Sequence, residues 1–423
     1  MGKDSNMSGL LYPAYQKLYS ALSNLERFNK EANFFDNITA IDSFFNEYRN
    51  ITFVLQSSLK HTEFFTAYEK NRDKYLTDHW FVEKRNETIK QKPFQLVKEI
   101  KITLYLPFGG FTVCEKKFSV ENDTPLDSLL LELKKMFSEI DKYEVCFSVS
   151  FFFHEENSEI DLLEKVCNGI SSMKKFMEVM DNEIGENCQL CKQLKENINK
   201  FHFADMAFDF LTINDYTYYP DKDLFDRAAR ISLILGEGNK KVATHRPLTE
   251  MINPKVLNYD GTPFGNFTFQ HAVIQGIQVN DIAPVIMVVY DDDTYDLDAF
   301  AADMKTTMYR KINEVAQLVY RYDVTEVCYV SLYSRIKFTE DTPKTSLERI
   351  KQATSEYLVS ASINKQLKAK EYIFNRKHLN DAKYVACVMK NGLNNDLDIT
   401  ATNLFPIRCA FEKKIEANQQ ISN

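Results

Sequence analysis

Residues 97–106 read VKEIKITLYL, and residues 111–120 read FTVCEKKFSV. Apolar and polar side chains alternate along much of both segments, which is typical of a β-strand with one buried face. The residues between them, Pro-Phe-Gly-Gly at 107–110, are typical of a turn. The two segments therefore predict a β-hairpin. Before residue 93 the apolar period is helical instead, so the pattern changes at this point of the chain.

The region before the hairpin predicts a helical bundle. Large apolar side chains recur there every three or four residues, which is the period of an amphipathic helix. Pro93 ends the last helix because proline has no backbone N–H to donate. We assign residues 1–95 to this bundle. Its predicted helices cover residues 10–33, 38–60, 63–76 and 80–90.

The rest of the chain predicts two further regions. Residues 96–245 mix strands and helices. Two of these helices, within 158–201 and separated near Gly185, could pack back on the bundle. The turn-rich stretch 236–263 marks the boundary to a C-terminal α+β region, residues 246–423. Further expected elements are strands at 143–153, 282–290, 324–333, 371–374, 384–389 and 407–411, and helices at 125–140, 223–235, 296–322 and 345–357.

The predicted fold class is α+β. An N-terminal helical bundle precedes a mixed α/β region, and a mostly antiparallel sheet with helices on one face ends the chain.

The composition excludes several classes of protein. The chain has 423 residues, of which 44% are hydrophobic and 26% charged, so it has enough core formers to fold. Its 52 basic and 60 acidic residues give a net charge of −8, which argues against a general nucleic-acid binder with a wholly basic surface. No apolar run approaches the roughly 20 residues that cross a membrane. The first residues lack the pattern of a signal peptide. We therefore expect a cytoplasmic protein with no membrane partner.

One short polar pattern points to a chemistry. Residues 81–90 read FVEKRNETIK, so Arg85 and Asn86 are adjacent late in the predicted bundle. An Arg-Asn pair in such a bundle resembles the HEPN superfamily, and the resemblance covers roughly residues 9–92. It implies a helical bundle that pairs as a homodimer. It also implies, for many members, a metal-independent ribonuclease of bacterial toxin–antitoxin, antiviral defence or stress systems.

The active pattern of that superfamily is Arg, four to six residues, and then His. The resemblance implies that Arg85 holds an RNA phosphate and that Asn86 orients the proton-transfer group. Lys90 stands near the place of the missing His, but with a reference pKa near 10.4 lysine is a poor base at neutral pH. Arg72 and His79, with six residues between them, do satisfy the spacing.

Other basic residues surround this pattern. The stretch 84–101 is rich in lysine, and we expect Lys84 and Lys92 to bind the phosphates of a nucleic acid. A second Arg-Asn pair, Arg49 and Asn50, has no His in its window. We interpret that second pair as polar residues buried between helices.

Two further patterns are candidates for metal or redox chemistry. Cys188 and Cys191 have the spacing of a CxxC motif. A structural zinc ion would need a second ligand pair, and a thioredoxin-like motif would open a helix after a strand. Since this pair falls inside predicted helical sequence, we interpret it as ordinary cysteines. Residues 291–298 read DDDTYDLD and could hold magnesium, or could form a turn that caps the helix predicted at 296–322.

The sequence thus favours a HEPN-like protein that cleaves RNA, or binds it as a catalytically degenerate member. This chemistry needs no cofactor and no metal. One alternative is a non-enzymatic interaction or scaffold protein, in which the 32 Phe and 22 Tyr residues simply form cores. Another is a magnesium-dependent enzyme that uses the aspartates of residues 291–298.

Overall fold

The computed structural model contains two compact units. Unit 1 comprises Met1–Lys101, Lys117–Val120 and Phe151–Thr212, and unit 2 comprises the remainder of the chain. The units are therefore interleaved along the sequence, unlike the consecutive segments 1–95, 96–245 and 246–423 expected above. The structure describes residues 9–29, 33–105, 112–119, 126–137, 144–185, 187–201, 203, 211–228, 232–233, 236–237, 240–251, 261–274, 282–302, 304–337, 351–378, 385–389 and 403–422.

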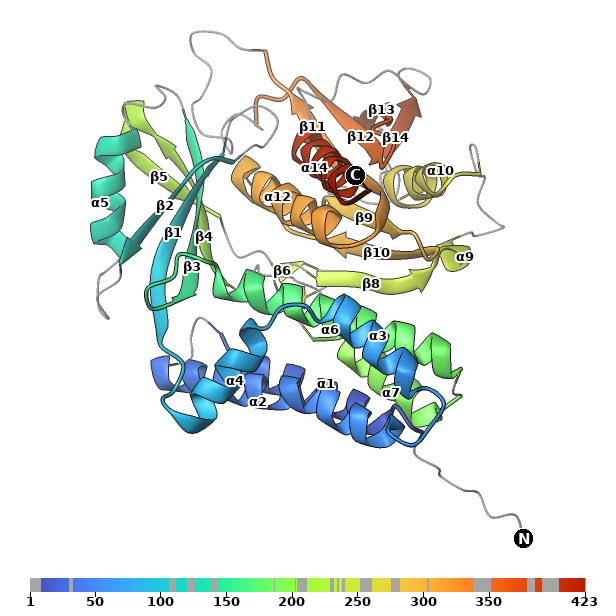
Figure 1. The fold of residues 1–423 in the computed structure, drawn as a ribbon. Helices are drawn as coiled ribbons and strands as arrows, with labels where there is room; N and C mark the ends of the chain where they lie inside the picture. The colour runs from blue at the N-terminus through green and yellow to red at the C-terminus, as the bar shows by residue number, and fades with distance from the viewer. Residues whose placement is uncertain are drawn as a thin grey trace. The chain divides into compact units, whose positions relative to one another are not determined.

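Unit 1 is built mainly from helices. The helices from residues 162–198 belong to the same unit as the N-terminal helices, with α6 beside α3 and α7 beside α1 (Figure 1). Gly185 ends α6 in the left-handed conformation, with φ of 64°, which glycine adopts without a Cβ clash. The described helices of this unit are α1 (Tyr12–Leu25), α2 (Phe34–Leu59), α3 (Phe65–Tyr75), α4 (Trp80–Lys90), α6 (Leu162–Ile184) and α7 (Gln189–Ile198).

Aromatic rings fill the core where α2, α4 and α6 meet. Phe81 of α4 is 3% exposed. Its ring centroid lies 4.6 Å from that of Tyr48 and 4.9 Å from that of Trp80. Gly169 of α6 faces the same ring, since a Cβ built on it would lie 2.0 Å from the nearest Phe81 ring atom. The absence of a side chain at Gly169 therefore allows α6 to approach α4.

Replacing Gly169 with alanine is expected to lower the free energy of unfolding by about 1–3 kcal/mol, the usual cost of overpacking a core. Trp80 is the single tryptophan of the chain, so its fluorescence during urea unfolding follows this core directly. Adding Phe81→Leu to the variant removes ring atoms and should restore part of the loss. An unchanged unfolding midpoint in Gly169→Ala would contradict the close packing.

The predicted hairpin is confirmed in a five-stranded sheet of order β2-β1-β3-β4-β5. Its turn at 107–110 lies outside the described residues. The helix expected at 223–235 is wrong, because residues 224–227 form an edge strand whose Phe225 packs its ring 4.5 Å from Tyr218. The elements are β1 (Leu96–Tyr105), β2 (Thr112–Ser119), β3 (Val145–Glu155), β4 (Thr212–Tyr219) and β5 (Leu224–Arg227), with α5 (Leu126–Phe137) and the short pair β6 (Ser232–Leu233) and β7 (Gly236–Glu237).

Unit 2 contains a seven-stranded sheet of order β14-β13-β12-β11-β9-β10-β8, in which every neighbouring pair is antiparallel. This sheet and the helices of unit 1 confirm the α+β class. The strands are β8 (Lys240–Pro247), β9 (Val285–Tyr290), β10 (Thr294–Ala299), β11 (Val324–Arg335), β12 (Ser355–Asn364), β13 (Ala369–His378) and β14 (Val385–Met389).

Helices cover this sheet. α12 (Lys305–Arg321) and α14 (Phe405–Ser422) share one core cluster with it (Figure 1). A second core cluster contains buried strand side chains that do not belong to the first cluster. It also contains side chains of α9 (Leu248–Met251), α10 (Pro263–Phe267) and the π-helical segment η3 (Thr268–Ile274).

Two element predictions in this region are wrong, and a third is right only in part. The helix expected at 296–322 is confirmed as α12 over 305–321, but its first residues, 296–299, belong to β10, whose backbone pairs with both β8 and β9. Residues 355–357 of the expected helix 345–357 begin β12, and 345–350 lie outside the described residues. The strand expected at 407–411 is part of α14, where Ile407, Ala410 and Phe411 share one buried helical face.

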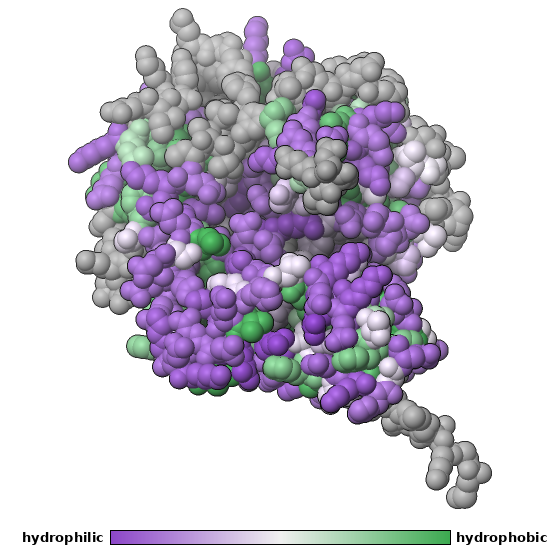
Figure 2. Space-filling view, viewed as in Figure 1, coloured by the Kyte–Doolittle hydropathy of each residue, from purple (hydrophilic) through white to green (hydrophobic). Residues whose placement is uncertain are grey.

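No helix among the described residues is long and apolar enough to cross a membrane. The face in Figure 2 is mostly hydrophilic over the helices of unit 1, and its hydrophobic residues are scattered there.

Candidate functional site

A cavity of about 350 Å³ opens within unit 1, lined by residues of α2, α3, α4 and α6. Tyr48 and Tyr68 form part of its wall. The Tyr48 hydroxyl donates to the backbone carbonyl of Gly169 at 2.8 Å, and the Tyr68 hydroxyl donates to that of Thr52 at 3.1 Å. Both hydroxyls thus link neighbouring helical segments. Arg49, Arg72 and His79 supply the basic groups of the lining.

Arg49 lies on the cavity side of α2. Its Nη1 donates to Thr52 Oγ1 at 2.7 Å, and its guanidinium carbon lies 4.3 Å from the centre of the Phe53 ring. Burial lowers the pKa of Arg49, and the positive charges of Arg85 and Arg72 lower it further. Arg49 is therefore close enough to Arg85 and to Arg72 to be repelled by both.

Arg72 lies in the last turn of α3. Its Nε and Nη2 atoms each lie 2.8 Å from Asp73 Oδ1, and the hydrogen bond to Asp73 raises the pKa of Arg72. The Asp73 side chain is 68% exposed. Exposed ion pairs contribute about 0–1 kcal/mol, so a phosphate can compete with Asp73 for this guanidinium.

Arg85 of α4 does not line the cavity, but its positive charge acts on Arg49. Arg85 Nη1 donates to Asn86 Oδ1 at 3.2 Å, whereas the sequence analysis expected Asn86 to orient a proton-transfer group. Its Nε is buried and has no acceptor among the described residues. A buried donor without an acceptor costs about 1–3 kcal/mol. Neither Arg85 nor Arg49 forms an ion pair with a carboxylate in the part of the chain that the structure describes.

His79 lies at the N-cap position of α4, is exposed, and lines the cavity with Arg72. The two residues lie on different helices, because α3 ends at Tyr75. Asp78 holds the connecting turn: its Oδ1 accepts from the Trp80 backbone N–H at 3.0 Å, and its Oδ2 lies 2.7 Å from Lys165 Nζ of α6. The turn thus brings a basic side chain and an imidazole to one cavity.

The lysines expected in the site lie elsewhere. Lys84 forms ion pairs with Glu87 and Glu155, and only 13% of its side chain is exposed. Lys92 Nζ lies 3.6 Å from Glu87 Oε1. Lys90 is exposed at the end of α4, about 140° around the helix from Arg85 at 3.6 residues per turn. None of the three lines the cavity.

Arg49 is the site residue that the sequence analysis assigned to packing. Its adjacent Asn50 matched the motif, but no His follows in the required window. Arg49 comes close to Arg72 and Arg85 only when α2, α3 and α4 pack together. The cluster is formed by distant positions in the sequence, so a search for a continuous motif cannot find it.

The aspartates of residues 291–298 do not form a metal site in the structure. Asp296 accepts from the His245 backbone N–H at 2.6 Å and from the Tyr290 hydroxyl at 3.0 Å. Asp298 Oδ2 lies 2.7 Å from Lys311 Nζ. Among the described residues, no group of three or more His, Cys, Asp or Glu side chains could hold a metal ion. These carboxylates therefore have protein partners, and the magnesium alternative gains no support.

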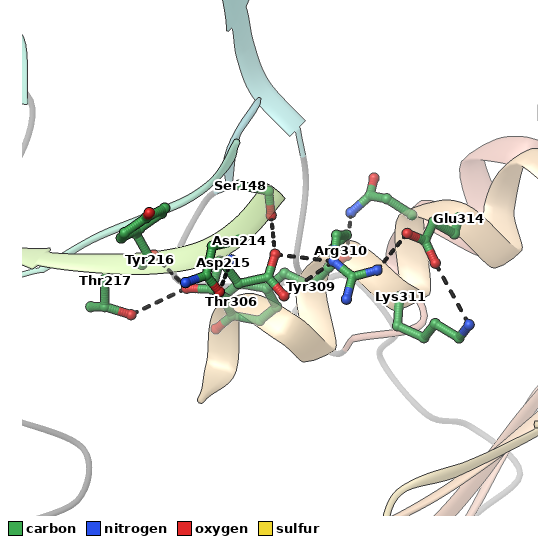
Figure 3. A network of polar contacts seen from close by, with 11 residues as sticks. Ser148, Asn214, Asp215, Tyr216, Thr217, Thr306, Tyr309, Arg310, Lys311 and Glu314 are labelled. Carbon is green, nitrogen blue, oxygen red and sulfur yellow. Dashed lines mark hydrogen bonds and ion pairs between the residues drawn. The ribbon is translucent and has the colours of Figure 1, made fainter. Parts of the chain in front are cut away.

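A second polar network lies in unit 2 and connects α12 with β3 and β4 (Figure 3). Arg310 Nε donates to the two carboxylate oxygens of Asp215 at 3.0 and 3.1 Å, and Nη1 donates to Glu314 at 2.6 Å. The Ser148 hydroxyl donates to Asp215 at 2.6 Å. The charged groups of this network pair with one another. We therefore assign the network a structural role, which is to join α12 to β3 and β4.

The chain matches no family model, no curated protein and no solved structure. Function therefore has to be argued from the charges and geometry of the cavity.

Proposed function

We propose that unit 1 binds the phosphates of an RNA at the cavity lined by Arg49 and Arg72. We further propose that it cleaves this RNA without a metal ion. One observation carries this proposal: Arg49 and Arg72 line one cavity from two helices, and the charge of Arg85 on a third helix acts on Arg49. Neither Arg49 nor Arg85 has a carboxylate partner among the described residues. Guanidinium groups bind phosphate oxygens in a bidentate way. A phosphate in the cavity would relieve the repulsion that Arg85 and Arg72 exert on Arg49.

His79 supplies the group that cleavage requires. An imidazole titrates near neutral pH, so it can take the proton of a ribose 2′-hydroxyl or protonate the leaving oxygen. In this arrangement Arg72 holds the phosphate next to His79, Arg49 and Arg85 stabilise its negative charge, and Asn86 positions Arg85. Lys84, Lys90 and Lys92 have no part in the proposed site.

The arrangement agrees with the HEPN-like resemblance in one respect: a basic and an imidazole side chain in that spacing reach one cavity of a helical unit. From the resemblance alone we further propose a homodimer, a role in bacterial defence or stress, and a cytoplasmic location.

Binding to a labelled single-stranded RNA in EDTA tests the proposal. Replacing Arg49 with glutamine should raise Kd by about 10- to 100-fold, the loss expected for a hydrogen bond to a charged group. The slope of log K against log salt should fall by about one. Fluorescence anisotropy over a salt series measures both quantities.

Arg27→Gln is the matched control, because Arg27 is an exposed arginine of the same unit that does not line the cavity. It changes the net charge equally and should leave Kd nearly unchanged. Equal losses in the two variants would mean that binding follows overall charge. No binding by the unaltered protein would favour the non-enzymatic interaction protein.

A further inference from the structure

Cys188 and Cys191 open helix α7, contrary to their interpretation as cysteines inside a helix. α6 ends at Ile184, α7 begins at Gln189, and Cys188 is its N-cap residue. The Cys188 sulfur accepts a hydrogen bond from the Cys191 backbone N–H at 3.3 Å. The first turn of a helix has unpaired N–H groups and a partial positive charge, both of which stabilise a thiolate.

The second cysteine is placed to react with the first. The Cys188 sulfur lies 3.3 Å from the Cys191 backbone nitrogen, and the two thiols share a hydrogen bond. The pair is therefore near the geometry of a disulfide, in which the Cβ atoms lie roughly 3.5–4.5 Å apart. Cys188 is 8% exposed and Cys191 is 3% exposed. Both residues are buried, and Cys188 is the more exposed of the two.

Hydrogen bonds distinguish Cys188 from Cys387 and Cys409. Burial acts to raise its pKa, but hydrogen bonds from the Cys191 thiol and from the backbone of Cys191, Gly9 and Leu190 outweigh burial, so the pKa of Cys188 is lowered. Burial instead raises the pKa of Cys387 and Cys409, whose side chains are more exposed than that of Cys188. Exposure thus predicts that an oxidant reacts first with Cys387 or Cys409, whereas the lowered pKa predicts that it reacts first with Cys188.

We propose that Cys188 and Cys191 are a redox-active dithiol that a hydroperoxide such as hydrogen peroxide converts into an intrachain disulfide. The Cys188 thiolate attacks one peroxide oxygen, the O–O bond breaks, and the released hydroxide leaves as water after taking a proton. This step gives a sulfenic acid at Cys188. The Cys191 sulfur then attacks the Cys188 sulfur, the S–O bond breaks, and a second water leaves. The two electrons lost by the thiols reduce the peroxide.

Limited oxidation of the full-length protein with hydrogen peroxide at neutral pH tests this proposal. After alkylation of the remaining thiols, peptide mass spectrometry should find Cys188 joined to Cys191, with a mass lower by two hydrogens. Cys387 and Cys409 should still be alkylated at that dose. Alkylated Cys188 in a sample where Cys387 or Cys409 is oxidised would overturn the proposal, because reactivity would then follow exposure.

Two variants assign the roles of the sulfurs. In Cys191→Ser the sulfenic acid at Cys188 has no partner thiol, so dimedone should label Cys188 and no disulfide should form. In Cys188→Ser, Cys191 should stay unlabelled and alkylatable. Labelling of Cys191 in that variant would reverse the assignment of the attacking sulfur. Far-UV circular dichroism identical to that of the unaltered protein shows that each variant is folded.

Discussion

Replacing Arg310 with alanine is expected to lower the free energy of unfolding by about 3–5 kcal/mol, the usual cost of removing one partner of a buried ion pair. The side chains of Arg310 and Asp215 are 11% and 4% exposed. Burial acts to lower the pKa of Arg310, but the carboxylates of Glu314 and Asp215 outweigh burial and raise it. Without Arg310, the buried Asp215 side chain loses its ion-pair partner, and among the described residues the Ser148 hydroxyl is the remaining donor to it.

Arg246→Ala is the control for that experiment. Arg246 and Glu250 form an ion pair in the same unit, with side chains 58% and 50% exposed, and such pairs contribute about 0–1 kcal/mol. Guanidinium chloride unfolding followed by far-UV circular dichroism measures both variants. Similar small losses in the two variants would contradict a structural role for the network in Figure 3.

The sequence predicted the elements whose local pattern agrees with their tertiary environment. Helix α4 occupies residues 80–90 as predicted, because its apolar period and Pro93 act together. The hairpin strands β1 and β2 also lie where the alternation placed them. In these segments the local preference and the buried face select the same structure.

The predictions failed where packing decided between similar patterns. Asp296 and Asp298 suggested a helix start, yet Tyr295, Leu297 and Ala299 alternate with them and fill a core cluster on one face of β10. In α14, the short apolar run at 407–411 was too brief for its period to separate a strand from a helix. In both segments, packing against residues far away in the sequence decides between a helix and a strand.

Some residues of the candidate site could likewise be predicted from the sequence, and others could not. The spacing of Arg72 and His79 could be found from the sequence, and both line the cavity. Arg49 could not be found, because its proximity to Arg72 and Arg85 arises from helix packing. Lys84 appeared to be available for RNA, but Glu155, 71 residues later in the chain, forms an ion pair with it.

Replacing His79 with alanine is expected to slow cleavage of RNA by about 10²–10⁴-fold, the usual contribution of a general acid or base. His79 is the histidine that lines the cavity beside Arg72, so it is the group through which we expect proton transfer to pass. Binding should change much less than the rate, since the phosphate is held by the arginines. Single-turnover cleavage of a labelled RNA in EDTA, with saturating protein, separates the rate from the affinity.

His61→Ala is the matched control, because His61 is an exposed histidine of unit 1 outside the cavity lining. The His61→Ala variant should cleave RNA at the rate of the unaltered protein. The products should carry a 2′,3′-cyclic phosphate, since attack by the ribose 2′-hydroxyl on the phosphate needs no water. Equal rates in His79→Ala and His61→Ala would remove His79 from the chemistry. RNA binding that depends on Arg49, with no cleavage by the unaltered protein, would instead identify a phosphate-binding unit that has lost catalysis.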